Sequence, residues 1–311
     1  MKEYILGVDI GGTTVKLGLF KSQGQLLEKW EIKTRKDHEG GYIIGDIVES
    51  LENKLDEKNI SKENVLGVGI GVPGPVKDDG TVLKCVNLGW EVFNIVQEVN
   101  KLIKLPVRAG NDANLAALGE MWQGGGKGYK DIVMVTLGTG VGGGIVIDGK
   151  IIPGYHGAGG EIGHIKVSND ETECCGCGNK GCLEQYTSAT GIVNLANKIL
   201  KNEKIETMLR AFKHLSAKDI FDSANLGDKL ALKLVDEYNA NLGIALANIS
   251  CVIDPEVFVI GGGVAQNGNA LIENITKHFK DNAFHVLRNT KFELAKLGND
   301  AGIYGAAKLI E

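Results

Sequence analysis

Four of the six cysteines in this chain of 311 residues lie within nine positions, in the segment 173–185 (ECCGCGNKGCLEQ). In a reducing compartment, clustered cysteines are more often metal ligands or catalytic groups than structural disulfides. The spacing Cys175-x-Cys177-x4-Cys182, with His164 eleven residues before it, supplies three thiolates and one imidazole. This closed set of four ligands is typical of structural zinc.

Another cysteine of the segment, Cys174, leaves other interpretations open. Together with Cys177 it makes a C-x-x-C pair, which suits redox chemistry or a different choice of metal ligand. The thiols could also pack without any ligand. Spacing alone is therefore compatible with a metal site, a redox pair or a packing cluster. The two remaining cysteines, Cys85 and Cys251, have apolar neighbours and are expected to be small buried side chains.

A second group that could do chemistry is the pair Asn111 and Asp112, in the segment 110–120 (GNDANLAALGE). The sequence predicts a helix from about 113 to 122, so both side chains stand at its beginning. There they would accept hydrogen bonds from first-turn amides, which is the ordinary capping role. A carboxylate in that place could instead serve as a general base toward a hydroxyl group. Capping and catalysis both stay open on this spacing.

Two glycine-rich turns, each between apolar strands, offer sites for phosphate. The first turn joins strands predicted at 4–10 and 15–20, and the second joins strands at 131–137 and 145–148. Glycine amides, unhindered by side chains, can converge on phosphate oxygens. Hydroxyl donors accompany them at Thr13, Thr14 and Thr139. Asp9, near the end of the first strand, is well placed to hold Mg²⁺, usually through water. The alternative is that both are plain hairpin turns.

The segments 69–74 (GIGVPG) and 138–143 (GTGVGG) both match the dinucleotide-binding pattern G-x-G-x-x-G. That fingerprint requires a strand, the turn and then a helix whose N-terminus receives the pyrophosphate. PVKDDGTVL follows the first segment and a strand follows the second, so neither fits. The sequence contains no Walker A motif. A Rossmann-type nucleotide site is therefore not expected.

The elements that must position these groups form two α/β lobes of related design. Strand, glycine turn and strand occur twice, roughly one domain apart, which indicates a duplication. A helix is predicted at about 41–58, and a long helix at about 227–251 leads into the strand EVFVIGGG. A last glycine-rich turn opens a C-terminal helix, which we expect to pack back on the first lobe.

Composition and charge limit the partners. With 34 basic and 39 acidic residues the net charge is -5 and no basic block stands out, so no nucleic-acid partner is expected. No apolar run approaches the roughly 20 residues of a membrane helix. The N-terminus lacks the pattern of a secretory signal. We therefore expect a cytoplasmic protein without a membrane partner.

Longer motifs connect these features to known proteins. DIGGTTVKLGL, LGTGVGGGI and GGGVAQ (261–266) resemble the two phosphate loops and the adenosine loop of the actin-like ATPase superfamily. EIGH (161–164), followed by CGCGNKGCLE (175–184), resembles the signature of the ROK family of sugar kinases, open reading frames and repressors. The motifs run from Asp9 to Gly305, so the resemblance covers essentially the whole chain. The segments CGNKGCLE, SATGI and GNDANLAALGE are most similar in sequence to the glucokinases of that family.

The resemblance implies roles for particular residues. It assigns structural zinc to His164, Cys175, Cys177 and Cys182, and it makes Asp112 the general base that takes the proton of a sugar C6 hydroxyl. It places the sugar at Gly74, Asn87, Asn111, Asp112, Glu161, His164 and Glu184. It places ATP, with Mg²⁺, at Asp9, Gly11, Gly12, Thr13, Thr14, Lys16, Thr139, Gly140, Gly262 and Gly263.

The resemblance further implies a two-lobed actin-like ATPase (ribonuclease H-like) fold, with ATP and sugar in the interlobe cleft. We expect a small lobe at 1–118 plus 298–311, a larger zinc-bearing lobe at 119–297, and a homo-oligomer, either a dimer or a tetramer. The implied reaction is ATP-dependent phosphorylation of glucose at C6, a step of glycolysis.

Other functions within the family stay open. N-acetylmannosamine or another hexose is the alternative acceptor, and a non-catalytic sugar-sensing regulator is the alternative of another class. Family repressors carry a helix-turn-helix domain before the first phosphate loop. Here Asp9 follows only eight residues, so no DNA-binding module is expected.

Overall fold

The computed structural model describes residues 2–311, which form an α/β protein with two five-stranded sheets. By its contacts the chain divides into two compact units. The first unit comprises the chain up to Ile132, Gly144–Gly160 and Lys296–Glu311, and the second comprises Val133–Gly143 and Glu161–Ala295. The α/β class and the two-part organisation are confirmed, whereas the lobe limits predicted at 118/119 and 297/298 stay a prediction.

The first sheet has the strand order β3-β2-β1-β4-β7. Its strands are β1 (Tyr4–Ile10), β2 (Thr14–Lys21), β3 (Leu26–Lys33), β4 (Val65–Val72) and β7 (Val107–Asn111). The first three pair antiparallel, while β4 runs parallel to β1 and β7 parallel to β4. The helices that belong to this unit are α2 (Ile43–Glu57), α3 (Ile95–Ile103), α4 (Asp112–Gln123) and α10 (Ala301–Ile310).

The strands β1 and β4 are buried on both faces of the first sheet, which explains their nearly continuous apolar character. Leu6 and Val8 point into a core that α2 and α3 complete. Ile5 points to the opposite face, where it packs with Phe20 and with Ile303 of α10. The alternation of side chains along β1 therefore supplies two cores at once.

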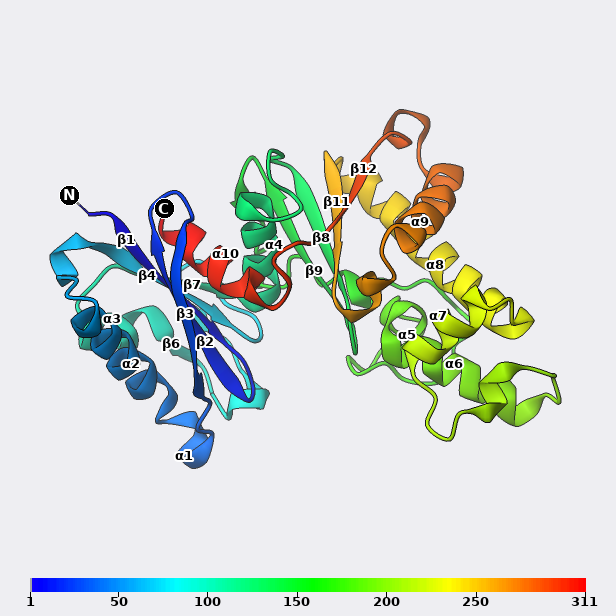
Figure 1. Ribbon diagram of the computed structural model, residues 1–311, viewed down its shortest axis with the longest axis horizontal. Coiled ribbons are helices and arrows are strands. Elements are labelled where there is room, and N and C mark those ends of the chain that lie inside the picture. Colours follow the sequence, from blue (N-terminus) through cyan, green and yellow to red (C-terminus); the bar gives the residue numbers. More distant parts are fainter. Residues whose placement is uncertain (1) are drawn as a thin grey trace. The chain divides into compact units, whose positions relative to one another are not determined.

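Helix α10 packs against β1, β4 and α4, as Figure 1 shows for the red C-terminal helix beside α4. Glycines make this approach possible. A Cβ added to Gly69 would lie 1.7 Å from the carbonyl oxygen of Ala306, and one added to Gly305 would lie 1.7 Å from that of Leu115. The prediction that the C-terminal helix packs back on the first lobe is confirmed.

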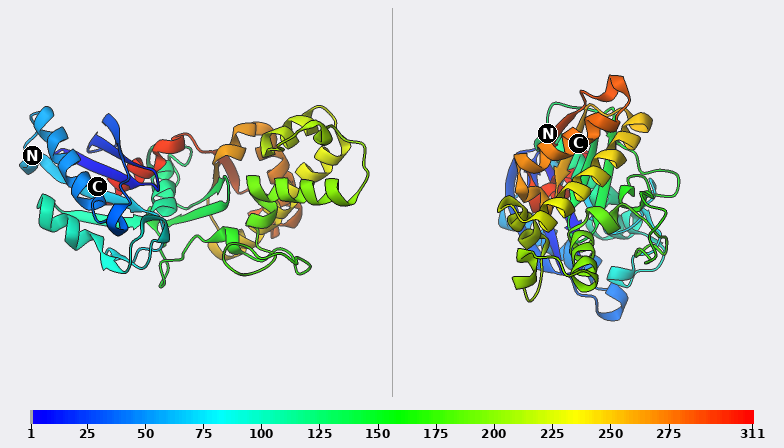
Figure 2. Two further views of the ribbon diagram at one scale, coloured as in Figure 1. Left: turned by 90° about the horizontal axis from the view of Figure 1, so that it is seen from below. Right: turned by 90° about the vertical axis from the view of Figure 1, so that its right-hand side faces the viewer.

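The second sheet has the order β10-β9-β8-β11-β12. Its strands are β8 (Ile132–Leu137), β9 (Val141–Ile147), β10 (Lys150–Ile151), β11 (Val257–Gly261) and β12 (Lys291–Leu294). The second unit contains the helices α5 (Glu184–Thr187), α6 (Ala189–Asn202), α7 (Ala217–Asn225), α8 (Lys229–Ile253) and α9 (Asn269–Asn282). Helices α8 and α9 lie side by side in both figures (Figures 1 and 2).

The helices predicted at 41–58, 113–122 and 227–251 correspond to α2, α4 and α8. Short elements complete the chain, namely α1 (Asp37–Gly40), β5 (Thr81–Val82) and β6 (Phe93–Asn94). Cys85 is buried as predicted, but Cys251 is exposed because it lies on the outer side of α8, so that prediction is wrong. Among residues 2–311 no helix is long and apolar enough to cross a membrane.

Candidate active site

The first glycine turn connects β1 to β2 and is held from outside by Thr34. Within the turn, the Gly11 amide donates to the carbonyl oxygen of Thr14 at 3.0 Å. The buried Thr34 donates its amide to Thr13 O at 2.9 Å and its hydroxyl to Gly11 O at 2.7 Å. These bonds occupy the carbonyl groups of Gly11, Thr13 and Thr14. Thr34 lies in no motif, so no local pattern indicates this role.

Two cations lie beside the first turn. A Cβ built on Gly12 would be 3.5 Å from the Nζ atom of Lys36, a residue that sequence reasoning also missed. The predicted ATP-binding residue Lys16 donates its ammonium group to the carbonyl oxygen of Asn299 at 2.8 Å. Positive charge near a loop of glycine amides favours a phosphate ligand.

Asp9, the penultimate residue of β1, is a partly buried carboxylate in an acidic neighbourhood. Burial, together with the charge of Asp112, raises its pKa to about 6 from the ordinary 3.8, and Lys16 acts in the opposite direction. Its carboxylate also faces the start of α10, because a Cβ added to Gly302 would lie 2.5 Å from Asp9 Oδ2. Two neighbouring carboxylates of this kind are the oxygen donors that a divalent cation prefers.

Asn111, rather than Asp112, caps helix α4. Its Oδ1 atom accepts the amide of Asn114 at 3.0 Å, while its Nδ2 atom donates to Gly74 O at 3.1 Å and to Asp112 Oδ1 at 3.0 Å. The same Asp112 oxygen accepts the amide of Ala113 at 2.8 Å. Asn111 is thus the N-cap residue, while the Asp112 carboxylate is held at the helix start by the Asn111 side chain and by a first-turn amide. The catalytic role of Asp112 stays a prediction.

Two weaker sugar candidates lie in loops of the same unit. Gly74 has a φ of 106°, which favours glycine, and its carbonyl oxygen is the one that Asn111 binds. Asn87 is exposed on a 3₁₀ turn, Val86–Leu88.

In the second unit, the four predicted metal ligands come together. The ligand atoms of His164, Cys175, Cys177 and Cys182 all lie within 4.8 Å of one another. The Sγ atoms of Cys177 and Cys182 are 3.6 Å apart, and Cys175 Sγ is 3.7 Å from His164 Nδ1. A tetrahedral zinc ion, with bonds of about 2.3 Å to sulfur and about 2.0 Å to nitrogen, sets its ligands roughly 3.5–3.8 Å apart. These four side chains therefore fit zinc.

The chemistry of the thiols agrees with that fit. Burial, and then the neighbouring Cys177 and Cys175 thiols, raise the pKa of Cys182 to about 12. Burial also raises the pKa of Cys175, whereas backbone hydrogen bonding lowers the pKa of Cys177. A cation is therefore needed to hold Cys175 and Cys182 as thiolates at neutral pH. All six cysteines are free thiols.

Glu184 connects this cluster to the second glycine turn. Its Oε2 atom accepts the amide of Val141 at 3.0 Å, and a Cβ added to Gly140 would lie 2.1 Å from the same oxygen. Its Oε1 atom is 3.5 Å from Cys175 Sγ. On the other side of the cluster, His164 directs Nδ1 toward the sulfur of Cys175 and Nε2 toward the Glu161 carboxylate, 3.8 Å away. One ring nitrogen thus faces the ligands and the other faces a predicted sugar residue.

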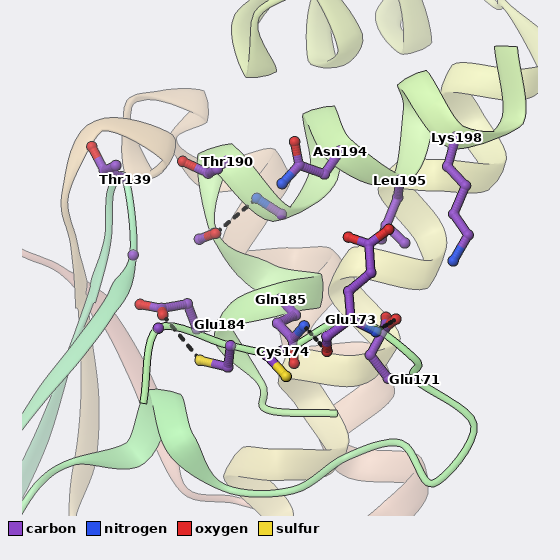
Figure 3. Close-up of a pocket in the computed structure, with 15 residues that line it drawn as sticks. Thr139, Glu171, Glu173, Cys174, Glu184, Gln185, Thr190, Asn194, Leu195 and Lys198 are labelled. Carbon is purple, nitrogen blue, oxygen red and sulfur yellow. Dashed lines mark hydrogen bonds between the residues drawn. The ribbon is translucent and has the colours of Figure 1, made fainter. Parts of the chain in front are cut away.

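Cys174 takes no part in the group of four ligand atoms. It is exposed and lines a pocket of about 350 Å³, together with Thr139, Gly140 and Glu184. Figure 3 shows it beside Gln185, with Thr190 and Asn194 of α6 on the opposite wall. The structure therefore gives no support to Cys174 as an alternative ligand.

A larger pocket of about 570 Å³ brings the second turn together with the predicted adenosine loop. Its wall includes Gly138 and Thr139 on one side and Gly263 and Val264 on the other. Helix α7 supplies much of the remaining wall. Gly262 has a φ of 87°, and a Cβ there would lie 2.4 Å from the carbonyl oxygen of Leu137, so this position requires glycine. We refer to this cavity as the nucleotide pocket.

The predicted residues thus form two groups. The first unit holds Asp9, Gly11, Gly12, Thr13, Thr14, Lys16, Gly74, Asn87, Asn111 and Asp112. The second holds Thr139, Gly140, Glu161, His164, Cys175, Cys177, Cys182, Glu184, Gly262 and Gly263. The first group can orient a carboxylate base beside a cation site, and the second can bind a metal ion and a nucleotide.

A glycine turn between paired strands in each unit, with a helix that starts at Asn111 and Asp112, defines an actin-like ATPase fold. Comparison with known proteins identifies one family. The sequence model of the ROK family matches residues 5–311, and the chain belongs to that family. A glucokinase of Halalkalibacterium halodurans is 42% identical over 99% of this chain and 95% of its own length.

Solved structures agree with this assignment. The ROK hexokinase of Thermus thermophilus superposes with a TM-score of 0.83 at 29% identity, covering 98% of this chain and 96% of the other. A ROK family glucokinase of Streptomyces griseus, solved with glucose and AMPPNP, gives a TM-score of 0.72 at 34% identity, with 98% of each chain covered.

Proposed function

We propose that this protein is a glucokinase, which transfers the γ-phosphoryl group of ATP to the C6 hydroxyl of glucose and yields glucose 6-phosphate and ADP. The observation that carries this is the placement of Asp112. Asn111 is the N-cap of helix α4, and the Asp112 carboxylate lies near Asp9. The same unit also contains the first glycine turn, which is of a kind that can bind phosphate. The 42% identity to a glucokinase over nearly the whole chain supports the choice of substrate.

In this mechanism Asp112 accepts the proton of the C6 hydroxyl while the sugar oxygen forms a bond to the γ-phosphorus. The bond from that phosphorus to the bridging oxygen of ADP breaks, and ADP leaves with the electron pair. Mg²⁺, when bound near Asp9, neutralises phosphate charge. The amides and hydroxyls of the two turns, including Thr13 and Thr139, orient the phosphates.

The sugar hydroxyls are oriented by hydrogen-bonding side chains from both groups. We assign this role to Gly74, Asn87, Asn111, Glu161, His164 and Glu184. Zinc at the cluster is structural: it fixes His164 and the segment that leads to Glu184, and it leaves the chemistry to Asp112.

A coupled ADP-release assay across a panel of hexoses tests the proposal. Glucose should be the best acceptor, and Asp112→Asn should lower kcat by about 10²–10⁴-fold while glucose affinity stays within roughly tenfold, because the amide keeps the shape but cannot take the proton. A higher kcat/KM for N-acetylmannosamine would move the protein to another substrate of the same class. Absence of turnover with every sugar, despite sugar binding, would favour a non-catalytic regulator.

We also propose that the enzyme works in the cytoplasm, where thiols stay reduced for metal binding, and that it assembles as a dimer or tetramer. The family resemblance supports the second point. Light scattering on the purified protein measures the assembly directly.

A further inference from the structure

Asn239 has a buried oxygen that no hydrogen-bond donor reaches. The residue lies on α8 and is 1% exposed. Its Nδ2 atom donates to the carbonyl oxygen of Val235 at 2.8 Å, but its Oδ1 atom has no partner among residues 2–311. Because the nitrogen is engaged by a carbonyl group, the amide cannot be turned round without losing that bond. The unpartnered atom is therefore an acceptor, and a buried acceptor without a donor is unfavourable.

Asn239 lines a small cavity of about 50 Å³, which we call the asparagine pocket. Four asparagines, each from a different element, contribute to its wall: Asn225, Asn239, Asn267 and Asn274. The volume is enough for an amino group and a few water molecules, since one water requires about 10–15 Å³. A polar cavity with an unused acceptor is suited to a hydrogen-bond donor from a ligand.

The asparagine pocket adjoins the nucleotide pocket. The two cavities have Phe221 of α7 and Asn267 in common as wall residues. Thr139, beside the second glycine turn, marks the phosphate side of the nucleotide pocket. Phe221 and Asn267 mark the part of its wall behind which the asparagine pocket lies.

We propose that the asparagine pocket selects the purine base of the phosphate donor, with Asn239 Oδ1 accepting a hydrogen bond from the exocyclic amino group of adenine, directly or through one water. Guanine carries a carbonyl oxygen at the same ring position. That oxygen and Asn239 Oδ1 are both acceptors, so they would repel each other instead of forming a hydrogen bond. This inference rests on the proposed function as an ATP-dependent kinase. It makes Asn239 a specificity-determining residue for the donor.

The first test uses the unaltered enzyme, so that folding of a variant is not at issue. Steady-state kinetics with glucose compare ATP, GTP and purine riboside triphosphate, which lacks the 6-amino group. We expect kcat/KM to be about tenfold lower for purine riboside triphosphate than for ATP, and lower still for GTP. Equal use of ATP and purine riboside triphosphate would overturn the inference while leaving the kinase function intact. Failure of all three donors would instead contradict the proposed function.

The second test links the selectivity to Asn239. In Asn239→Leu, which keeps the size but removes the acceptor, the preference for ATP over purine riboside triphosphate should vanish, with KM for glucose unchanged. Thr276→Val is the matched control, because Thr276 Oγ1 is also buried without a partner but the residue does not line the asparagine pocket. It should retain the tenfold preference. An unchanged preference in folded Asn239→Leu would show that another group reads the base.

Discussion

The two glycine turns follow the same backbone plan but obtain their carboxylate in different ways. In the first, the acid is Asp9, which belongs to β1 itself and pairs across the strands with Lys16. In the second, neither β8 (IVMVTL) nor β9 (VGGGIVI) contains an acid. The carboxylate is Glu184, which arrives from α5 and accepts the amide of Val141, 43 residues away in sequence.

This difference has a physical consequence for the integrity of each turn. Asp9 is in place whenever the first sheet forms, and its carboxylate lies close to Gly302 at the start of α10. Glu184 is in place only when the segment between Cys175 and Cys182 is folded, because that segment leads directly into α5. The first turn should therefore be insensitive to the metal, and the second should depend on it.

Removal of the metal should give the largest effect. Prolonged chelation, or Cys182→Ser, should lower kcat/KM by about 10–100-fold or more, since loss of a ligand releases the loop that holds Glu184. Amide hydrogen exchange should accelerate in peptides that cover 138–147 and stay unchanged in peptides that cover 9–21. Metal analysis of the purified protein provides the reference value of one zinc per chain. Equal acceleration in both turns would show that the cluster supports the whole fold rather than one turn.

Asp9→Asn should have the next largest effect, and its sign depends on pH. The folded carboxyl titrates near 6 and an unfolded one near 3.8, so folding is favoured at low pH and this advantage is lost as pH rises from about 4 through 6. The difference of about two pKa units between the folded and unfolded carboxyl corresponds to roughly 3 kcal/mol of unfolding free energy. Without nucleotide or Mg²⁺, Asp9→Asn should thus raise the free energy of unfolding by up to roughly 3 kcal/mol at pH 7 and by little at pH 4.

Urea unfolding at the two pH values measures this change, and the same variant should use Mg²⁺-ATP poorly. Equal stability of the two proteins at pH 7 would mean that Asp9 is better solvated than its burial indicates.

Gly302→Ala should act on the first turn by steric pressure alone. The added Cβ would lie 2.5 Å from the carboxylate of Asp9, which is itself confined, so we expect a loss of about 1–3 kcal/mol in unfolding free energy. Gly45→Ala in α2 is the control, because nothing lies within 4 Å of the added atom, and it should stabilise by about 0.5–1 kcal/mol. Thermal unfolding distinguishes them. A neutral Gly302→Ala would show that α10 can shift away from β1.

The features that the sequence predicts correctly are those that depend on a short, continuous stretch of residues. The Cys3His set, the strand–glycine–strand units and the amphipathic helix α2 each depend on a spacing of a few residues, which a periodic or motif pattern reveals. Asp9 belongs to this class, since a carboxylate near the end of a buried strand is visible in YILGVDI.

The features that were missed depend on contacts between distant segments. Glu120 looks like an ordinary helical glutamate in GNDANLAALGE, yet it is fully buried and accepts the amides of Gly125, Lys296 and Leu297. Thr34 closes a turn more than twenty residues before it. No local pattern distinguishes such residues from their exposed equivalents, because the partner amides are brought to them only by the tertiary fold.

Glu184→Gln should give the smallest effect and separates the two contacts of this side chain. The amide can still accept the amide hydrogen of Val141 through one oxygen, so that bond weakens from a charged to a neutral one, a change of about 0.5–1.5 kcal/mol. The new N–H group of the glutamine can donate a hydrogen bond toward Cys175 Sγ. A metal-bound thiolate is negatively charged, so it is better matched by this donor than by a carboxylate. We therefore expect zinc content to be unchanged and exchange at 138–141 to accelerate by less than about tenfold, with a modest rise in the KM for glucose. Loss of zinc from Glu184→Gln would instead mean that the carboxylate is needed to assemble the cluster. The metal site would then depend on the second turn, rather than the second turn on the metal site.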